Sequence, residues 1–180
     1  MDFKEKVLAV KNIYDGVVVH LDKEKVKLPN GKKAIREIVH HQGAVGIIAI
    51  TPENKIVLIR QWRATVGHTT LEIPAGKIEA NEQDDPLKTA RRELNEETRF
   101  AASDLELVSK FYTSPGFSDE MMYLYHAVGL TSVDHKLPQD SDEFLELVEL
   151  SPLEVQKEID NGEICDAKTI MAIMFWQMMD

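Results

Sequence analysis

The most informative part of the chain is Gly76–Phe100, GKIEANEQDDPLKTARRELNEETRF. Pro86 suits the first position of a helix, because its missing N–H would have no partner there. Asp84 or Asp85 supplies a side-chain oxygen that can cap the same end. We therefore predict that a helix begins near residue 86.

The predicted helix carries three carboxylates on one flank. Its apolar stripe is formed by Leu87, Ala90 and Leu94. Glu93 and Glu97 lie along the edge of that stripe, and Glu96 lies just beyond them. Like charges at these spacings cost an isolated helix ~0.2–0.5 kcal/mol per pair unless a cation lies among them. Oxygen ligands without thiolate or imidazole favour magnesium or manganese over zinc. An acidic run is equally typical of a solvated helix face, so RRELNEE alone leaves both interpretations open.

The residues before this helix favour the metal interpretation. Leu71-Glu72-Ile73-Pro74-Ala75-Gly76 is typical of a strand that ends in a turn. Such a segment would bring a backbone carbonyl and a loop to the start of the helix. Strand, glycine-containing loop and acidic helix together predict a site for a metal ion and phosphate.

These residues resemble the Nudix box. Its pattern is Gly, five residues, Glu, seven residues, Arg-Glu, an aliphatic residue, any residue, Glu-Glu, any residue, Gly and an aliphatic residue. The matching positions are Gly76, Arg92-Glu93-Leu94, Glu96-Glu97 and Phe100. The resemblance implies that Glu93, Glu97 and the Ala75 carbonyl hold the metal, and that Glu96 is shared or lies just behind. Gly76 and Arg92 are expected to have structural roles, with Arg92 bracing the loop and the carboxylates.

The chain departs from the pattern at two places. The interval between Gly76 and Arg92 is two residues longer, so the first acidic position is either Glu82 or Asp84. Arg99 replaces the glycine that commonly ends the helix with positive φ, which costs roughly 1 kcal/mol unless the helix end is built differently.

Composition limits the classes of protein to which this chain can belong. With 180 residues and 43% hydrophobic content, it can form one domain with a core and a small N-terminal appendage. A net charge of −10 argues against binding the backbone of nucleic acid. The single cysteine, Cys165, and the absence of a signal-peptide pattern favour a reducing cytoplasm. No apolar run approaches the roughly 20 residues that span a bilayer, so no membrane association is expected.

The N-terminal residues alternate in short β-prone runs. They are Lys6 to Ile13, Gly16 to Leu21, Lys25 to Leu28 and Lys33 to Val39, with Asn30-Gly31 as a hairpin turn. They predict an antiparallel sheet, residues 1–40, followed by a catalytic domain, residues 41–180. In the Nudix enzymes that the chain resembles, the N-terminal strands contribute to a homodimer.

Two apolar strands, Gly43 to Ile50 and Lys55 to Gln61, are expected to form a core hairpin. The second runs into Arg60-Gln61-Trp62-Arg63. Arginine suits phosphate because its planar fork donates parallel hydrogen bonds, although both arginines can instead pair with carboxylates of this acidic chain. The segment resembles the ADP-ribose pyrophosphatase branch of the Nudix family, which favours substrate contact for Arg60 and Arg63. Glu72 is then expected beside the substrate or metal, or paired with an arginine.

Two later loops carry further site predictions. Ser114-Pro115-Gly116 places Pro115 sixteen residues beyond Arg99, which resembles the marker of the ADP-ribose branch. Glu120 of the same loop is a further substrate-contact candidate. In the loop before the strand Phe144 to Leu150, the resemblance assigns Glu143 to orienting or deprotonating the attacking water, with Asp142 in reserve.

The end of the chain predicts two helices. Ser151-Pro152-Leu153-Glu154 forms a capping box, and Asn161-Gly162 ends the first helix. Asp166 is expected to cap the last helix. The spacing of its residues predicts one largely apolar face, made of Ile170, Ile173, Met174 and Gln177.

The resemblance implies an α/β (α+β) fold, the Nudix α/β/α sandwich with a mixed sheet, plus the N-terminal antiparallel sheet. It also implies Mg²⁺- or Mn²⁺-dependent hydrolysis of a nucleotide sugar, ADP-ribose to AMP and ribose 5-phosphate. The alternatives are another nucleotide substrate, or a Nudix-like module that senses a nucleotide without cleaving it.

Overall fold

The computed structural model describes residues 2–135, 137–138 and 144–179. Contacts within the chain divide it into two compact units. One comprises Met1–Gly43 with Tyr112–Met121, and the other comprises Ala44–Phe111 with Met122–Asp180. The unit that contains the expected N-terminal sheet therefore also includes a segment between two later strands.

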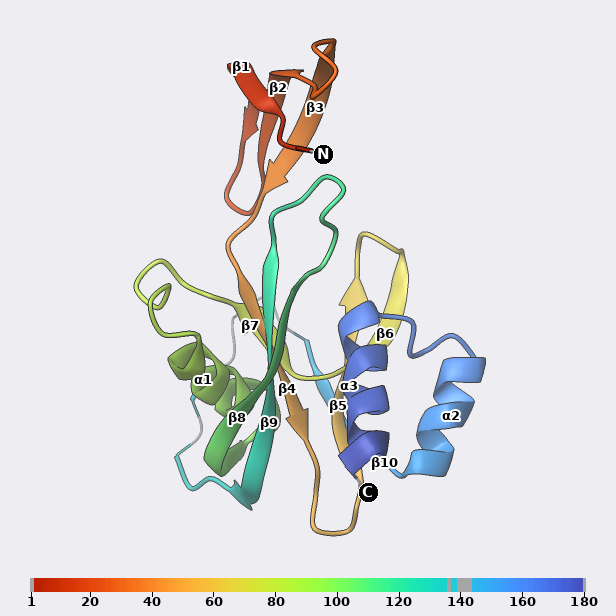
Figure 1. Ribbon diagram of the computed structural model, residues 1–180. Coiled ribbons are helices and arrows are strands. Elements are labelled where there is room, and N and C mark those ends of the chain that lie inside the picture. Colours follow the sequence, from red (N-terminus) through yellow and green to blue (C-terminus); the bar gives the residue numbers. More distant parts are fainter. Residues whose placement is uncertain (1, 136, 139–143, 180) are drawn as a thin grey trace. The chain divides into compact units, whose positions relative to one another are not determined.

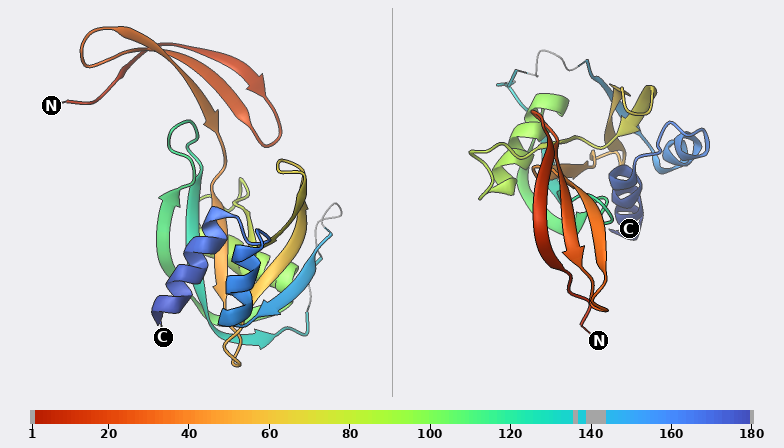
Figure 2. Two further views of the ribbon diagram at one scale, coloured as in Figure 1. Left: turned by 90° about the vertical axis from the view of Figure 1, so that its right-hand side faces the viewer. Right: turned by 90° about the horizontal axis from the view of Figure 1, so that it is seen from above.

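The N-terminal sheet is antiparallel, with strand order β1-β2-β3 (Figures 1 and 2). The strands are β1 (Lys6–Asp15), β2 (His20–Lys27) and β3 (Lys33–His40). The expected separate strands Gly16 to Leu21 and Lys25 to Leu28 are wrong, because one continuous strand, β2, pairs with β3 along its whole length. The Asn30-Gly31 turn is confirmed: Gly31 has φ 84°, and its N–H donates to the Leu28 carbonyl at 2.9 Å.

The second unit contains a mixed sheet of order β7-β4-β9-β8 (Figure 1). Its strands are β4 (Ala44–Ala49), β7 (Ala75–Lys77), β8 (Phe100–Tyr112) and β9 (Met121–Ser132). Strand β4 pairs parallel with β9 and antiparallel with β7, which confirms the mixed sheet. Another sheet, of order β10-β5-β6, contains β5 (Ile56–Arg63), β6 (His68–Glu72) and β10 (Glu146–Leu150).

The expected hairpin of Gly43 to Ile50 with Lys55 to Gln61 is wrong. After a single antiparallel bridge between Ile50 and Ile56, β4 and β5 separate into different sheets. Strand β4 is buried on both faces along its whole length, and β5 is buried over its first half. A continuous apolar run predicts burial but does not identify the neighbouring strand.

Helices cover the mixed sheet on both faces. The helices are α1 (Pro86–Thr98), α2 (Pro152–Asp160) and α3 (Ala167–Met179). Val45, Ile47 and Ala49 of β4 pack in one core cluster with Ala90 and Leu94 of α1. The intervening residue Ile48 packs in the other cluster with α2 and α3. Period-two alternation along one strand thus divides the core into two layers.

The capping predictions at the C-terminal helices are confirmed. Ser151 and Glu154 form the capping box of α2, and Gly162 follows that helix with φ 79°. Asp166 accepts a hydrogen bond from the Thr169 backbone N–H at 3.0 Å.

The expected face of α3 is confirmed for Ile170 and Ile173, which pack in the core, but it is wrong for Met174 and Gln177, which are exposed. The residues that the helix buries are Lys168, Thr169, Ala172, Ile173 and Trp176. The helix is apolar on most sides, so periodicity alone did not select the buried stripe. No helix in the described part of the chain is long and apolar enough to span a membrane.

Candidate active site

The acidic helix α1 starts where the sequence predicts. Pro86 lies in its first turn, and the Asp85 carboxylate accepts a hydrogen bond from the Lys88 N–H at 3.3 Å. The carboxylate-bearing residues Glu93 and Glu97 are only 8% and 5% exposed. They are therefore not part of a solvated face.

Two contacts join these carboxylates to the loop that precedes the helix. The Ala75 N–H donates to Oε2 of Glu97 at 2.8 Å. A Cβ atom added to Gly76 would lie 2.0 Å from Oε1 of Glu93. A side chain at residue 76 would therefore displace the Glu93 carboxylate from its present position. The loop and the two glutamates thus form one packed unit.

Arg92 links the other acidic residues of the box. Its guanidinium donates to Glu82 at 3.0 Å, to Glu93 at 2.8 Å and to Glu96 at 2.8 Å. Burial lowers the pKa of Arg92, but the bond to Glu82 and the charges of Glu93 and Glu96 outweigh it and raise the pKa above its usual value. The Nε atom of Arg92 is buried without a partner among the described residues. The expected bracing of the carboxylates by Arg92 matches this geometry.

Glu82, rather than Asp84, lies in this cluster. Glu82 is buried, and its Oε2 atom also accepts the Thr89 hydroxyl at 3.0 Å. The bond from Arg92 is the main cause that lowers the pKa of Glu82. Asp84 is exposed. The lengthened loop therefore keeps the spacing of the pattern between Gly76 and the first acidic position of the box, which is Glu82.

The helix ends in the left-handed conformation although residue 99 is not glycine. Arg99 has φ 64° and ψ 22°, and its N–H donates to the Asn95 carbonyl at 2.9 Å. Its guanidinium donates to the Leu137 carbonyl. The Asn95 side chain bonds to the same connection, donating to the His135 carbonyl at 3.1 Å and accepting from the Leu137 N–H at 3.0 Å. The helix end thus holds the start of the segment after β9.

At the end of β6, the buried carboxylate of Glu72 forms an ion pair with the half-buried Arg63. Nε and Nη2 of Arg63 donate to the two Glu72 oxygens, each at 2.7 Å. Thr70 donates to Glu72 at 2.7 Å, and Lys168 from α3 also donates to it. Burial raises the pKa of Glu72, but Arg63, Lys168 and Thr70 together lower it to about 2. Glu72 is therefore paired with an arginine, one of the two roles expected for it.

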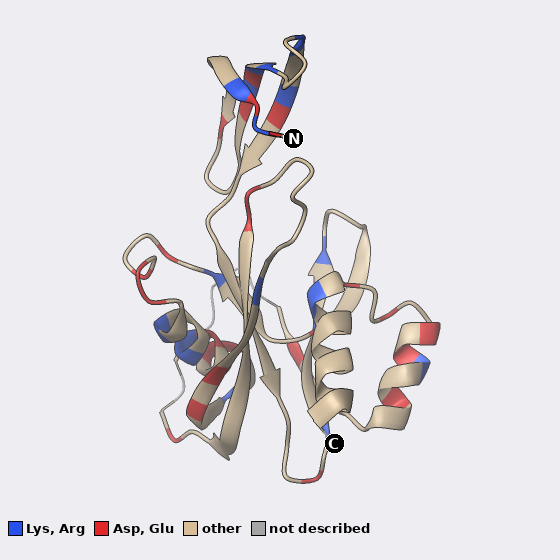
Figure 3. Cartoon of the chain, viewed as in Figure 1, with Lys and Arg blue, Asp and Glu red and all other residues tan. Residues whose placement is uncertain are grey.

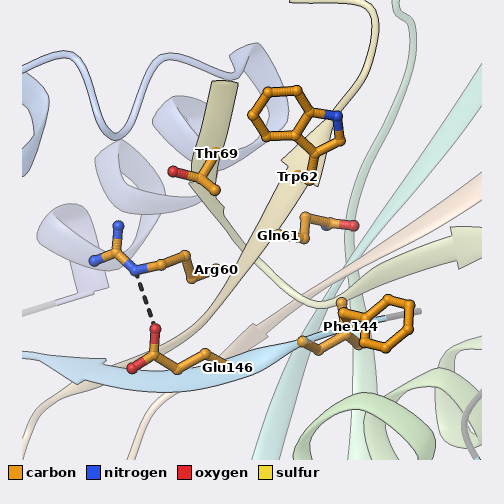
Figure 4. A pocket seen from close by; sticks show the side chains of 7 residues that line it. Arg60, Gln61, Trp62, Thr69, Phe144 and Glu146 are labelled. Carbon is orange, nitrogen blue, oxygen red and sulfur yellow. Dashed lines mark ion pairs between the residues drawn. The ribbon is translucent and has the colours of Figure 1, made fainter. Parts of the chain in front are cut away.

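Arg60 faces an open surface pocket of ≈ 530 Å³ in the same unit (Figure 4). Its guanidinium lies 3.3 Å from Glu146 and 2.8 Å from Glu163. Trp62 and Phe144 also line the pocket, and they are 62% and 86% exposed. Both arginines of the Arg60–Arg63 segment thus pair with carboxylates of this chain. Nη1 of Arg63 makes no hydrogen bond with the residues that the structure describes.

The remaining predicted site residues lie elsewhere. Pro115 and Glu120 belong to the unit of the N-terminal sheet. Glu143 and its reserve Asp142 lie outside the described residues.

Three contributors to this region were not predicted from the sequence, namely Thr89, Asn95 and Lys168. Thr89 and Asn95 carry a usable signal, because each is a polar residue inside a predicted helix, where propensity alone does not favour it. Lys168 stands in an otherwise apolar helix, which indicates a buried partner for its charge. That partner, Glu72, is 96 residues away in sequence.

The comparisons with known proteins agree with this geometry. A NUDIX domain model matches residues 40–172. The chain is 44% identical over 178 residues to the methanol dehydrogenase activator of Bacillus methanolicus, covering 99% of this chain and 95% of that protein. It is 43% identical over 177 residues to the ADP-ribose pyrophosphatase of Bacillus subtilis (strain 168), covering 98% and 95%. A solved ADP compounds hydrolase superposes with a TM-score of 0.82 at 22% identity, covering 95% and 91%.

The chain therefore belongs to the Nudix family, and the recognition of the box is confirmed. The structural match confirms the expected fold. Nudix ADP-ribose pyrophosphatases are in general dependent on a divalent metal.

The donor chemistry of the α1 region fits such a metal. Its oxygen donors are the buried carboxylates of Glu93 and Glu97 beside Ala75. Among the described residues, no group of three or more His, Cys, Asp or Glu side chains is arranged to hold an ion.

Proposed function

We propose that this chain hydrolyses the pyrophosphate bond of ADP-ribose, giving AMP and ribose 5-phosphate, with Mg²⁺ or Mn²⁺ as cofactor. The observation that carries the proposal is the packing of Glu93 and Glu97 against the Ala75-Gly76 loop. Buried carboxylates held at a loop and a helix are suited to a hard cation and a diphosphate. The identity to the ADP-ribose pyrophosphatase supports the choice of substrate.

The box residues have distinct roles in this proposal. The Ala75 carbonyl, Glu93 and Glu97 would hold the metal, and Glu96 would share it or orient the ligands. A bound divalent cation neutralises the diphosphate and lowers the pKa of a water molecule. Arg92 keeps Glu93 and Glu96 in place, since it donates to both. Glu143 is proposed to orient or deprotonate the attacking water, on the family resemblance.

Substrate contacts are proposed for Arg60, Arg63, Pro115 and Glu120. Arg63 is supported by its geometry, since Glu72 occupies Nε and Nη2 and leaves Nη1 for a phosphate oxygen. Glu72 then acts by orienting this guanidinium and keeping it charged. Arg60 would have to exchange its bonds to Glu146 and Glu163 for a substrate oxygen, so it contributes less binding energy.

A second copy of the chain is proposed to cover the N-terminal sheet. Every residue of β1 is exposed, including Leu8, Val10 and Ile13. Contiguous exposed apolar side chains on a strand commonly mark an interface. In the view of Figure 3, strands β1–β3 carry charges of both signs rather than a basic face, which does not favour nucleic acid as the partner.

A phosphate-release assay tests the activity. The protein is incubated with Mg²⁺ and ADP-ribose, a nucleotide-sugar panel or dinucleoside polyphosphates, and a coupled phosphatase converts phosphomonoester products to phosphate. Preferential turnover of ADP-ribose is expected, with AMP and ribose 5-phosphate as products. If another substrate were preferred, hydrolysis of a pyrophosphate bond would stand, but the assignment of Pro115 to ADP-ribose recognition would be overturned.

A second candidate is a regulatory role, because a relative of 44% identity is named for activating a dehydrogenase. In this case the chain would bind a nucleotide without cleaving it. Tight nucleotide binding by calorimetry with no product under Mg²⁺ or Mn²⁺ would favour this candidate. The retention of Glu93, Glu96 and Glu97 favours hydrolysis.

A further inference from the structure

The segment Thr113–Glu120 is attached to the end of β3 by backbone hydrogen bonds. The Val39 N–H donates to the Phe117 carbonyl at 2.7 Å, and the Asp119 N–H donates to the Val39 carbonyl at 3.2 Å. Val39 and Ser118 form a parallel bridge. These residues belong to one unit of the chain. The segment thus adds a short strand-like edge to the N-terminal sheet.

Two histidines that follow this bridge hold the carboxylates at the end of the segment. Oδ2 of Asp119 lies 2.6 Å from Nδ1 of His40, and Oδ1 accepts the His41 backbone N–H at 3.0 Å. Oε1 of Glu120 lies 3.2 Å from Nδ1 of His41. Its Oε2 atom accepts the Thr113 hydroxyl at 2.6 Å, which closes the base of the loop. An ionised carboxylate only accepts hydrogen bonds, so His40 carries a proton on Nδ1.

The second ring nitrogen of His40 faces another carboxylate. Nε2 lies 3.6 Å from Oδ2 of Asp22 on β2. A neutral imidazole with its proton on Nδ1 would present a lone pair to Asp22, whereas an imidazolium presents an N–H to each carboxylate. The protonated ring therefore makes a charge-assisted hydrogen bond to Asp119 of the loop and a longer ion pair with Asp22 of β2.

The surroundings of His40 are predominantly acidic. The hydrogen bond to Asp119 is the main cause that raises the pKa of His40, with smaller contributions from the charges of Asp22 and Glu24, while burial lowers it. The ionisable groups near His40 are Asp119 and Glu120 of the loop, Asp22, Glu24 and His20 of β2, and its neighbour His41. In this set, the groups that can carry a positive charge are His20 and His41.

We propose that His40 is a positioning residue whose protonated ring clamps the Pro115-containing segment to β2 and β3, and that loss of the proton loosens the segment. The clamp is fully present below the ordinary histidine pKa and is lost as pH rises through the raised pKa of His40 in the folded protein. Its effect on catalysis rests on the proposed function, in which Pro115 contacts the substrate. On that basis the KM for ADP-ribose rises with pH by about threefold to tenfold, the effect of weakening one hydrogen bond.

The clamp is tested first without substrate. NMR follows the imidazole nitrogens of His40 and the amide hydrogen exchange of Phe117, Ser118 and Asp119, corrected for intrinsic rates, between pH 5.5 and 8.5. His40→Arg retains a cation at every pH, and His40→Gln retains none. His68→Gln is the matched control, since His68 is exposed and belongs to the other unit of the chain.

In the wild type, amide protection is expected to fall as His40 loses its proton at a pH above 6.5, the ordinary histidine value. Protection that does not change with pH is expected in both position-40 variants, high in His40→Arg and low in His40→Gln. The control should follow the wild type. Titration of His40 below 6.5, or equal protection in His40→Gln and the wild type at pH 6, would overturn the clamp.

The second arm measures kcat and KM for ADP-ribose over the same pH range. The expected change is in KM, with kcat altered little, and it should be absent in His40→Arg. A clamp seen by exchange with no change in KM would overturn the positioning role. Absence of any ADP-ribose turnover would refute the proposed function instead, because the exchange arm tests the clamp independently.

Discussion

At the scale of single residues, Glu72 offers the clearest test of electrostatics. Its folded pKa of about 2 lies below the ordinary value of 4.5. The stability that this shift contributes is present above pH 4.5 and is lost as pH falls toward 2. Removing the charge would also leave Arg63 and Lys168 without their shared partner.

We expect Glu72→Gln to lower the free energy of unfolding at pH 7 by about 3 kcal/mol, the equivalent of the pKa shift. The difference in the free energy of unfolding between the variant and the wild type should be about 2 kcal/mol smaller at pH 3 than at pH 7, because the wild type loses the same charge as pH falls. Urea unfolding at both pH values measures this difference. Glu106→Gln, at an exposed position, is the control. A gap that is equal at both pH values would contradict the assigned pKa.

The identities of several box residues could be predicted from sequence, but their contacts could not. The spacing left Glu82 and Asp84 equivalent, since each preserves one interval of the pattern. The choice depends on how the lengthened loop folds, which places Glu82 against Arg92 and Thr89. Arg60 shows the same limit, because its partners Glu146 and Glu163 are distant in sequence.

At the scale of elements, the end of α1 contains a measurable strain. Arg99 adopts positive φ, a conformation that costs a residue with a Cβ ~1–2 kcal/mol. The side chain offsets part of this cost through its bond to the Leu137 carbonyl. Glycine and alanine at this position both lose that bond and differ only in the Cβ.

We therefore expect Arg99→Gly to be more stable than Arg99→Ala by about 1 kcal/mol. Thermal and urea unfolding of the two variants measure the difference directly. Equal stability, or a more stable alanine variant, would show that this helix end is not left-handed in solution.

Elements with strong local signals were predictable, whereas their pairing was not. Pro86 and the capping residues fix where α1 and α2 begin, because these effects act within one turn. The prediction of a β4–β5 hairpin was wrong because each apolar run is equally compatible with a buried strand in either sheet. In the fold, β4 pairs with β7 and β9, whereas β5 pairs with β6 and β10, and all of these partners except β6 are distant in sequence from the strand with which they pair.

At the scale of the whole molecule, the exposed face of β1 predicts self-association. We expect the wild type to have twice the chain mass of 20.4 kDa by light scattering. The double variant Leu8→Lys, Val10→Lys should have the mass of one chain, because buried like charges oppose association. Glu53→Lys, on an exposed turn of the other unit, is the control. A monomeric wild type, or a dimeric double variant, would rule out this surface.

The proposed hydrolysis depends on a metal held by the α1 carboxylates. The most direct measurement is ADP-ribose turnover with Mg²⁺ by the wild type, Glu97→Gln and the control Glu106→Gln, with circular dichroism for folding. Glu97→Gln should remain folded and lose more than ~100-fold in kcat, because metal charge stabilisation is worth several kcal/mol and each 1.36 kcal/mol is tenfold. Glu106→Gln should match the wild type. Wild-type turnover by folded Glu97→Gln would contradict the metal site.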